Sequence, residues 1–383
     1  MKSLQHSFII LECNGIWRPV HWPNGWKRKL YDTYTCIIMF LLVSLVLSEC
    51  VEFVRLLDNV EAFAHNSFIL LSMIGVCGKA MNILIKRDEI FELAKALERD
   101  PLRPKSEDEL MIQRTFDEMV RSNTLRYAAL LGIAFIAQMW RSFVDDIPQK
   151  VLIHNCWLPV GCHQSLLCYF IAYSHQVVAI IIASAVNVAF DTLVTGLIMQ
   201  TSAQLHILKH RFRQFLLYCS INALLLTQSS LFSLEKKSFI HRCFFLCRFA
   251  KTLNEIFGIM IFIQYTSSTF VICVSVFQLS KMKLFSAEFT FCLLYSVAML
   301  IQIFMFCFYG GEGTLEVNVG DAIYEMNWTT LNIKTKKSLL TIMLRTLRPI
   351  EFTSLYIITL NLVSFNSLLK LSYSMYSVLQ QKE

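Results

Sequence analysis

Charged residues are scarce in this chain of 383 residues: they make up 16% of it, against roughly 25% in a typical soluble domain. Turn-forming residues are also few, with 12 glycines and 7 prolines, whereas 55% of the residues are hydrophobic. A soluble fold would have too little polar surface, and a membrane β-barrel would alternate apolar with polar residues. The apolar runs here are continuous, which predicts an all-α membrane protein.

Sequence motifs of catalysis and metal binding are missing as well. The chain has no glycine-rich phosphate loop, no His-Glu-x-x-His sequence and no Cys-x-x-Cys pair, so we expect no enzyme, no metal and no cofactor. Its net charge of +7 comes from lysines and arginines that lie between the hydrophobic segments. No basic face is formed, and a nucleic-acid partner is therefore not expected.

Seven segments are apolar over the roughly 20 residues that a helix needs to cross a hydrocarbon core. No internal repeat or low-complexity linker divides them, so residues 1–383 are predicted to form one seven-helix membrane domain. The predicted spans are residues 35–54, 68–85, 127–144, 166–200, 256–279, 285–309 and 352–379.

The distribution of basic residues predicts the orientation of these spans. Of the 35 lysines and arginines, 26 lie before the first span or in the even-numbered loops, and 4 lie in the odd-numbered loops or the C-terminal tail. Positive charge marks the cytoplasmic side. We therefore expect a cytoplasmic N-terminus and an extracellular C-terminus, which is the reverse of a G-protein-coupled receptor.

The fourth span is too long for the bilayer, since 35 residues of helix extend roughly 52 Å. Its excess is expected to tilt or to project into the cytoplasm. Residues 215–226 and 336–348 read as shorter helical stretches, and we expect them to pack together under the membrane.

Ionisable residues inside spans are costly and are therefore candidates for a function. Glu49 and Glu52 lie near the outer end of the first span, where Glu52 and Arg55 have the spacing of a helical ion pair at the interface. Lys79 lies within reach of the cytoplasmic interface. For these residues a structural explanation is preferred.

The fourth span carries two further polar candidates, Asp191 and His175. Structural hydrogen bonding is the preferred explanation for Asp191, while His175 is expected to face either a pocket or a neighbouring helix. Cys156 and Cys162 share a short loop, and the sequence leaves open whether they form a disulfide.

The end of the chain resembles the final segment of the insect odorant receptors. In that family an Arg-Pro pair, here Arg348-Pro349, precedes the last helix. A Phe-x-x-x-Leu-Lys run follows, here 365–370, and then Ser372-Tyr373-Ser374 near the C-terminus. Residues 15–19, Gly-Ile-Trp-Arg-Pro, and Tyr324 with Trp328 are also similar to the family.

The resemblance implies a ligand-binding subunit that assembles with the family's co-receptor, Orco, into a tetrameric odorant-gated cation channel. The long cytoplasmic insertion of Orco itself is missing here. Small volatile odorants, permeant cations and the lipid membrane would be its partners, in the plasma membrane of olfactory neuron dendrites. A gustatory-type channel subunit and a small-molecule carrier are the alternatives, although the gustatory C-terminal pattern and the repeats of a carrier are not found.

In the family the pocket lies in the outer half of the bundle, among the second to sixth spans. An odorant has few polar groups, so an apolar pocket with one or two polar anchors is expected. For any single candidate, a role in helix packing is the preferred explanation, because aromatic residues supply much of the packing area in a bundle. The candidate odorant-binding residues are Phe68, Leu71, Phe135, Gln138, Met139, Tyr173, Gln176, Thr269, Phe291 and Tyr295.

The family's pore is lined by the last helices, whose outer end here carries Tyr376, Val378, Leu379 and Gln381. Aligning the chain ends places Val378 where the family has its apolar gate residue. A ring of apolar side chains can close a pore by excluding water, although lipid-facing packing would also explain them.

Overall fold

The structure is a computed structural model, and it describes most of the chain with several gaps. The described residues are 3–19, 22, 25–55, 60–100, 102–157, 165–221, 229–284, 286–315, 351–355 and 357–381, together with Ile333, Lys336, Lys337 and Leu340. Most of the stretch 336–348 and all of residues 222–228 lie outside this set, and so do Tyr324, Trp328 and Cys162.

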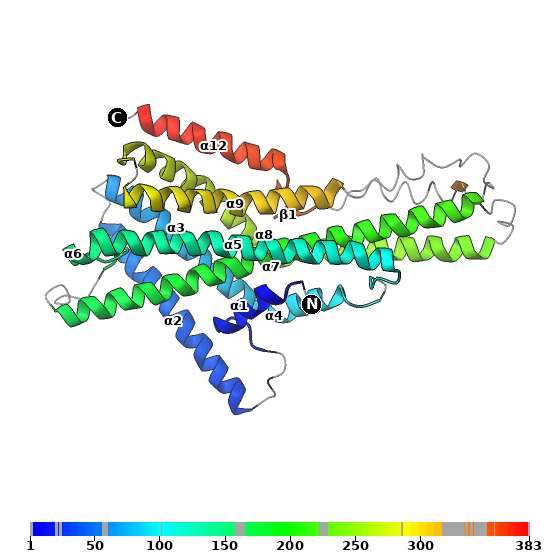
Figure 1. Cartoon of the computed structure of the whole chain (residues 1–383), viewed down its shortest axis with the longest axis horizontal. Coiled ribbons are helices and arrows are strands. Elements are labelled where there is room, and N and C mark those ends of the chain that lie inside the picture. Colours follow the sequence, from blue (N-terminus) through cyan, green and yellow to red (C-terminus); the bar gives the residue numbers. More distant parts are fainter. Residues whose placement is uncertain are drawn as a thin grey trace.

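Long helices account for nearly the whole described chain (Figure 1). Each of the seven predicted spans falls on a different one of them. These helices are α2 (Trp26–Arg55), α3 (Val60–Ile85), α5 (Glu107–Arg141), α7 (Leu166–Ile221), α8 (Ser229–Lys281), α9 (Ala287–Leu315) and α12 (Leu362–Gln381).

By length and composition, five of the described helices can cross a bilayer, or six if α3 and the short α4 (Arg87–Ala96), which meet at a bend of 71°, form one span. The last helix, α12, is more polar because asparagine, lysine and serines interrupt its apolar residues. The predicted all-α membrane fold is confirmed.

Helices α7 and α8 extend far beyond a membrane span. They contain 56 and 53 residues, and at 1.5 Å per residue each is roughly 80 Å long. Their far ends lie side by side (Figure 1), where the rings of Phe212 and Phe239 have centroids 4.7 Å apart. The expected projection of the fourth helix beyond the bundle is therefore present, and it is longer than the sequence suggested.

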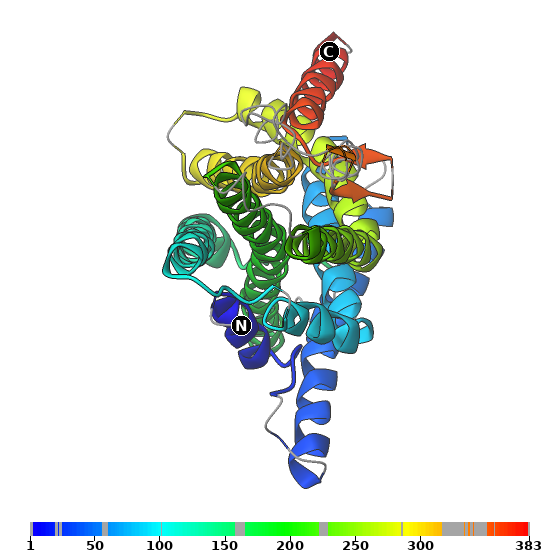
Figure 2. The same cartoon turned by 90° about the vertical axis from the view of Figure 1, so that its right-hand side faces the viewer.

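The middle of the bundle is occupied by α7 (Figure 2), which contacts α1, α2, α3, α5, α8 and α9. Small and β-branched residues such as Ala179, Ala183, Val186 and Ala189 are buried along it. Small side chains let helices approach closely in a membrane. The central position of α7 therefore follows from its sequence, and it brings α7 next to most of the other helices.

A short N-terminal helix, α1 (Gln5–Cys13), packs against α7. Ser7 Oγ and Thr192 Oγ1 are 2.9 Å apart. At Gly196 of α7 a Cβ atom would lie 2.5 Å from Leu4 Cδ2, so any other residue there would force the Leu4 side chain to shift. The sequence showed only a short apolar run in this region, and we did not predict a helix.

The predicted start of the last span, at Phe352, is wrong. Residues Thr353–Ser354 and Ile358–Thr359 form a small antiparallel hairpin, β1 and β2, and α12 begins only at Leu362. Ser354 Oγ donates to the carbonyl of Gly258 at 2.7 Å, and Asn361 Oδ1 accepts from the backbone N–H of Ser364 at 2.9 Å. The asparagine thus caps the helix start, which favours this boundary.

The structure gives the state of two cysteines. Cys156 is a free thiol, so it does not form the disulfide with Cys162 that the sequence left undecided. Cys168 is disulfide-bonded.

Candidate functional site

A cavity of about 120 Å³ lies inside the bundle. Helices α3, α5, α7, α8 and α9 form its walls, and His154, in the loop before α7, closes part of it. Its lining residues are Ile69, Ser72, Met73, Val76, Tyr127, Leu131, Ala134, Phe135, Gln138, His154, Ile180, Ala183, Ser184, Asn187, Gln264, Phe291, Tyr295, Ala298, Met299 and Gln302.

The cavity runs along the helix axes. On α5 it extends from Tyr127 to Gln138, and on α9 from Phe291 to Gln302. Eleven residues of helix correspond to roughly 16 Å, so the space suits an elongated small molecule. Most of the wall is apolar, and the polar side chains gather mainly towards its two ends.

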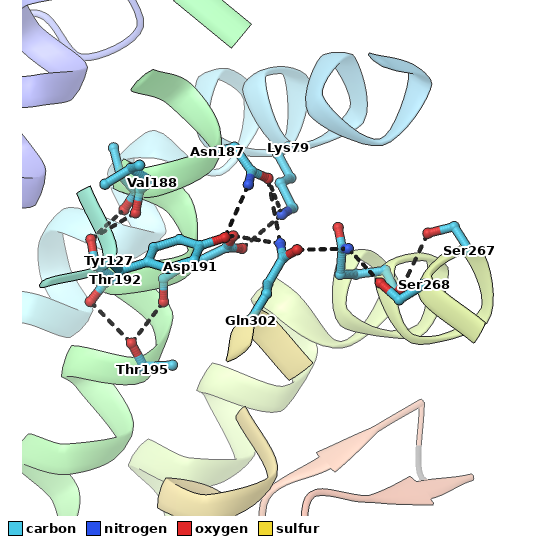
Figure 3. A network of polar contacts seen from close by, with 12 residues as sticks. Lys79, Tyr127, Asn187, Val188, Asp191, Thr192, Thr195, Ser267, Ser268 and Gln302 are labelled. Carbon is cyan, nitrogen blue, oxygen red and sulfur yellow. Dashed lines mark hydrogen bonds and ion pairs between the residues drawn. The ribbon is translucent and has the colours of Figure 1, made fainter. Parts of the chain in front are cut away.

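At one end, which we call the ion-pair end, a buried charge pair contacts the lining residues Asn187 and Gln302 (Figure 3). Lys79 Nζ lies 2.7 Å from Asp191 Oδ1, and these side chains are 1% and 0% exposed. Lys79 Nζ also donates to Asn187 Oδ1 at 2.6 Å. The expectation that Lys79 reaches the interface is therefore wrong, because its ammonium group turns inward to Asp191. Structural hydrogen bonding of Asp191 is confirmed.

Three cavity-lining side chains complete this network (Figure 3). Gln302 Nε2 donates to Asp191 Oδ2 at 2.5 Å, and Tyr127 OH donates to the same oxygen at 3.4 Å. Asn187 Nδ2 donates to Tyr127 OH at 3.3 Å. A buried ion pair is tolerated where further hydrogen bonds satisfy its remaining atoms. The wall of the cavity thus supplies the partners of the charge pair.

At the other end, which we call the loop end, His154 is fixed from several sides. His154 Nδ1 lies 2.8 Å from Glu49 Oε1, and His154 Nε2 lies 3.0 Å from Gln138 Nε2. Because a carboxylate only accepts, Nδ1 donates to Glu49, and Nε2 pairs with the Gln138 amide. Gln176 holds the loop by accepting from the His154 backbone N–H at 3.2 Å and donating to its carbonyl at 3.0 Å.

Glu49 therefore differs from the interfacial carboxylate that we expected. It is fully buried and paired with His154 across the bundle. Arg55, expected to pair with Glu52, places its guanidinium 5.9 Å from the centre of the Trp157 ring. The sequence left open whether His175 faces a pocket or a neighbouring helix. It faces a neighbouring helix, because His175 Nε2 lies 2.9 Å from Ser44 Oγ of α2.

Four of the ten candidate ligand-binding residues line the cavity. These are Phe135, Gln138, Phe291 and Tyr295. Gln176 lies one layer behind, against the His154 loop. The side chain of Phe68 is outside the described set.

The remaining candidates lie elsewhere on the same helices. Tyr173 OH and Ser142 Oγ are 3.1 Å apart, and the Thr269 carbonyl accepts from Ser372 of α12 at 3.2 Å. Leu71 and Met139 are half-buried on α3 and α5 but are not part of the lining. The lining set differs from the candidates because the rotation of each helix about its axis decides which residues face inward.

Several polar residues of the site were missed in the sequence. Ser184, Asn187, Gln264 and Gln302 all line the cavity, but a single uncharged polar residue in an apolar span gives little signal. His154 lies in a loop, and nothing in its sequence surroundings indicated that the loop enters the bundle.

The pore candidates lie on α12, which packs against α8 and α9. Asn366, Lys370 and Ser374 are exposed on it at four-residue intervals, and Val378, 56% exposed, follows at the next interval. Tyr376 is half-buried and stacks near Tyr373, with ring centroids 6.4 Å apart. The predictions for Leu379 and Gln381 fall on side chains outside the described set.

An apolar helical bundle with these features is a multi-pass membrane protein. The model of the "7tm Odorant receptor" family matches residues 59–373, which is most of the chain. The chain therefore belongs to the odorant receptor family, as its C-terminal motifs indicated. This is a family of receptors and not of enzymes.

The chain is similar to several insect receptors along nearly its whole length. It is 24% identical to "Odorant receptor 46a, isoform A" of Drosophila melanogaster, with 94% of each chain covered. It is 21% identical to "Odorant receptor Or1" of Anopheles gambiae, with 98% of this chain and 94% of that one covered.

The fold is similar to the solved structure of the olfactory receptor OR5 from Machilis hrabei. The TM-score is 0.83 at 15% identity, with 99% of this chain and 98% of that chain covered. The complex of the same receptor with eugenol gives a TM-score of 0.84 at 16% identity. The likeness shows a shared fold of the whole chain.

Proposed function

We propose that this receptor binds small volatile molecules in the cavity and acts as the ligand-tuning subunit of an odorant-gated, non-selective cation channel. The cavity is the observation that carries this proposal. It lies inside the bundle, is mainly apolar and is about 120 Å³ in volume, and such sites suit small ligands with few polar groups. The OR5 receptor of similar fold has been solved with eugenol, a small molecule.

The exposed face of α12 supports a role in conduction. Its other face packs on α8 and α9, which leaves Asn366, Lys370 and Ser374 exposed. Polar and charged residues are costly against lipid and mark water-filled pathways in membrane proteins. In the proposed channel, Tyr376, Val378, Leu379 and Gln381 form the outer part of the pore, and Val378 is the apolar constriction.

We further propose that the chain assembles with the Orco co-receptor in the plasma membrane of olfactory neurons, with its N-terminus in the cytoplasm. The distribution of lysine and arginine supports this orientation. The sequon Asn327-Trp328-Thr329 then lies on the cytoplasmic side and stays unmodified. A glycan on Asn327 in protein expressed in insect cells would contradict the orientation.

The proposed function is tested by recording currents from cells that express the chain alone or with the co-receptor, across a broad odorant panel. Odorants should evoke cation currents that differ in ranking from those of the co-receptor alone. A chain that reaches the surface with the co-receptor but adds no odorant response would refute the proposal. Uptake of an odorant without current would instead favour a carrier.

A further inference from the structure

The polar wall of the cavity near the ion-pair end presents hydrogen-bond donors. Ser184 and Asn187 both line the cavity and both belong to α7. They are three residues apart, so their side chains share one face of the helix, with Cβ atoms about 5–6 Å apart. The surrounding wall consists mainly of residues such as Leu131, Ala183 and Met299.

The ion pair fixes the orientation of the Asn187 amide (Figure 3). Lys79 Nζ has only hydrogens to donate, so the atom of Asn187 that it contacts at 2.6 Å is the amide oxygen. The NH₂ group is consequently turned away from Lys79, towards Tyr127, whose hydroxyl accepts one of its hydrogens at 3.3 Å. Within the described part of the chain, the second hydrogen has no acceptor.

Ser184 supplies the second donor. A serine within a helix usually bonds back to the carbonyl four residues earlier, as Ser202 and Ser296 do here. Ser184 Oγ makes no such bond, and it has no partner among the residues that the structure describes. Ser184 lines the cavity, and the hydrogen-bonding capacity of its hydroxyl is unused within the described structure.

The loop end differs in this respect. His154 and Gln138 bond to each other, and His154 bonds to Glu49. On the walls between the two ends, Ser72 bonds to Tyr295. Leaving a polar group without a partner in an apolar cavity costs free energy that a ligand oxygen would recover. The unused donors therefore mark the place where a polar group of the ligand gains most.

We propose that Ser184 and Asn187 form an oxygen-binding subsite, so that the receptor is tuned to neutral carbonyl-bearing molecules with an elongated apolar body. This inference rests on the proposed function and names its ligand class. Two donor atoms that each lie about 2.9 Å from one ligand oxygen can be at most about 5.8 Å apart. Residues on one helical face, such as Ser184 and Asn187, can bring their donor atoms within that distance. An ammonium group has only hydrogens to donate and could not pair with the Asn187 NH₂ group, so the subsite favours a carbonyl oxygen over an amine.

The test compares two ligands that differ only at the oxygen. Methyl hexyl ketone and the alkene in which a methylene group replaces its carbonyl oxygen have nearly the same shape. Their dissociation constants are measured by thermal-shift titration of the purified full chain in lipid nanodiscs. The ratio of the two dissociation constants is compared between variants, because the difference in hydration between the free ligands then cancels.

In Ser184→Ala the ketone should lose affinity three- to tenfold relative to the alkene, because one hydrogen bond contributes about 0.7–1.4 kcal/mol. Affinity for the alkene should stay the same. Ser275→Ala is the matched control, since Ser275 Oγ is buried without a partner in the described structure and lies outside the cavity lining. That variant should leave the ratio unchanged.

Three results would overturn the subsite. The ketone-to-alkene ratio could be the same in Ser184→Ala as in the wild type, both ligands could weaken equally, or the wild type could bind neither. Each leaves the proposed function standing if other odorants still evoke currents with the co-receptor. A receptor that binds the ketone through Ser184 but never conducts would support the subsite and refute the proposed channel function.

Discussion

The buried pair Lys79–Asp191 allows a sharp test of how this bundle is stabilised. Replacing Lys79 by methionine keeps most of the side-chain volume but leaves the Asp191 carboxylate without its countercharge, 0% exposed and at the centre of the bundle. Removing one partner of a buried ion pair costs about 3–5 kcal/mol. Asn187 Oδ1 would lose its bond from Lys79 as well.

A loss of that size is a large fraction of a typical folding free energy of about 5–15 kcal/mol. Lys79→Met should therefore lower both surface expression and the melting temperature of the detergent-solubilised receptor. The double variant Lys79→Met/Asp191→Leu removes both charges, and apolar replacements of buried pairs are often neutral or stabilising. Its expression should recover most of the loss.

Lys86→Met is the matched control. Lys86 Nζ lies 2.7 Å from Glu89 Oε1, the same distance as in the buried pair, but these side chains are 38% and 52% exposed. An exposed pair contributes about 0–1 kcal/mol, so this variant should melt like the wild type. The reasoning is refuted if Lys79→Met is as stable as Lys86→Met, or if the double variant is no better than Lys79→Met.

Three further predictions concern the cavity, the extended helices and the pore. Shortening Phe135 or Tyr295 to Ala should change the ranking of odorants more than surface expression, by about 1–3 kcal/mol for ligands that contact the altered wall. Equal scaling of all responses in a dose-response series would place the site elsewhere. Arg211→Met should lower thermal stability by about 1.5–3 kcal/mol, because Arg211 bonds to both carboxylate oxygens of Glu109; an unchanged melting curve would show that this pair is unimportant. Val378→Asn should raise resting current or alter ion permeation without changing odorant order, and normal basal current at matched expression would mean that Val378 is not the gate.

The spans could be predicted because their signal is strong and local. Long apolar runs such as residues 166–200 far exceed the roughly 10–14 residues of an average helix in a globular protein, and each predicted span overlaps a different long helix. The start of α12 was missed because Phe352 to Leu360 is as apolar as a span. Tertiary bonds such as that between Ser354 and the Gly258 carbonyl hold it as a hairpin, and a sequence does not reveal these.

The interior of the site was predictable only in part. Phe135 and Phe291, which line the cavity, were among the candidates because aromatic residues in apolar spans are conspicuous. Leu71 precedes the lining residues Ser72 and Met73. One position along a helix corresponds to a rotation of about 100° around its axis. The sequence sets that rotation only through all of a helix's contacts together, so a list drawn from single spans includes neighbours of the site.

In the proposed channel, α8 is placed to connect ligand binding with the pore. Gln264 lines the cavity and donates to Gln302 Oε1 at 3.1 Å, while the next residue, Tyr265, donates from its hydroxyl to the Ser364 carbonyl of α12 at 2.5 Å. Adjacent residues of one helix thus contact the cavity and the helix that we assign to the pore. A ligand shifts an equilibrium only by its difference in affinity for the two states. We therefore expect ligand contacts with α8 and α9, which both pack against α12, to depend on the position of α12 more than contacts with α5 and α7 do.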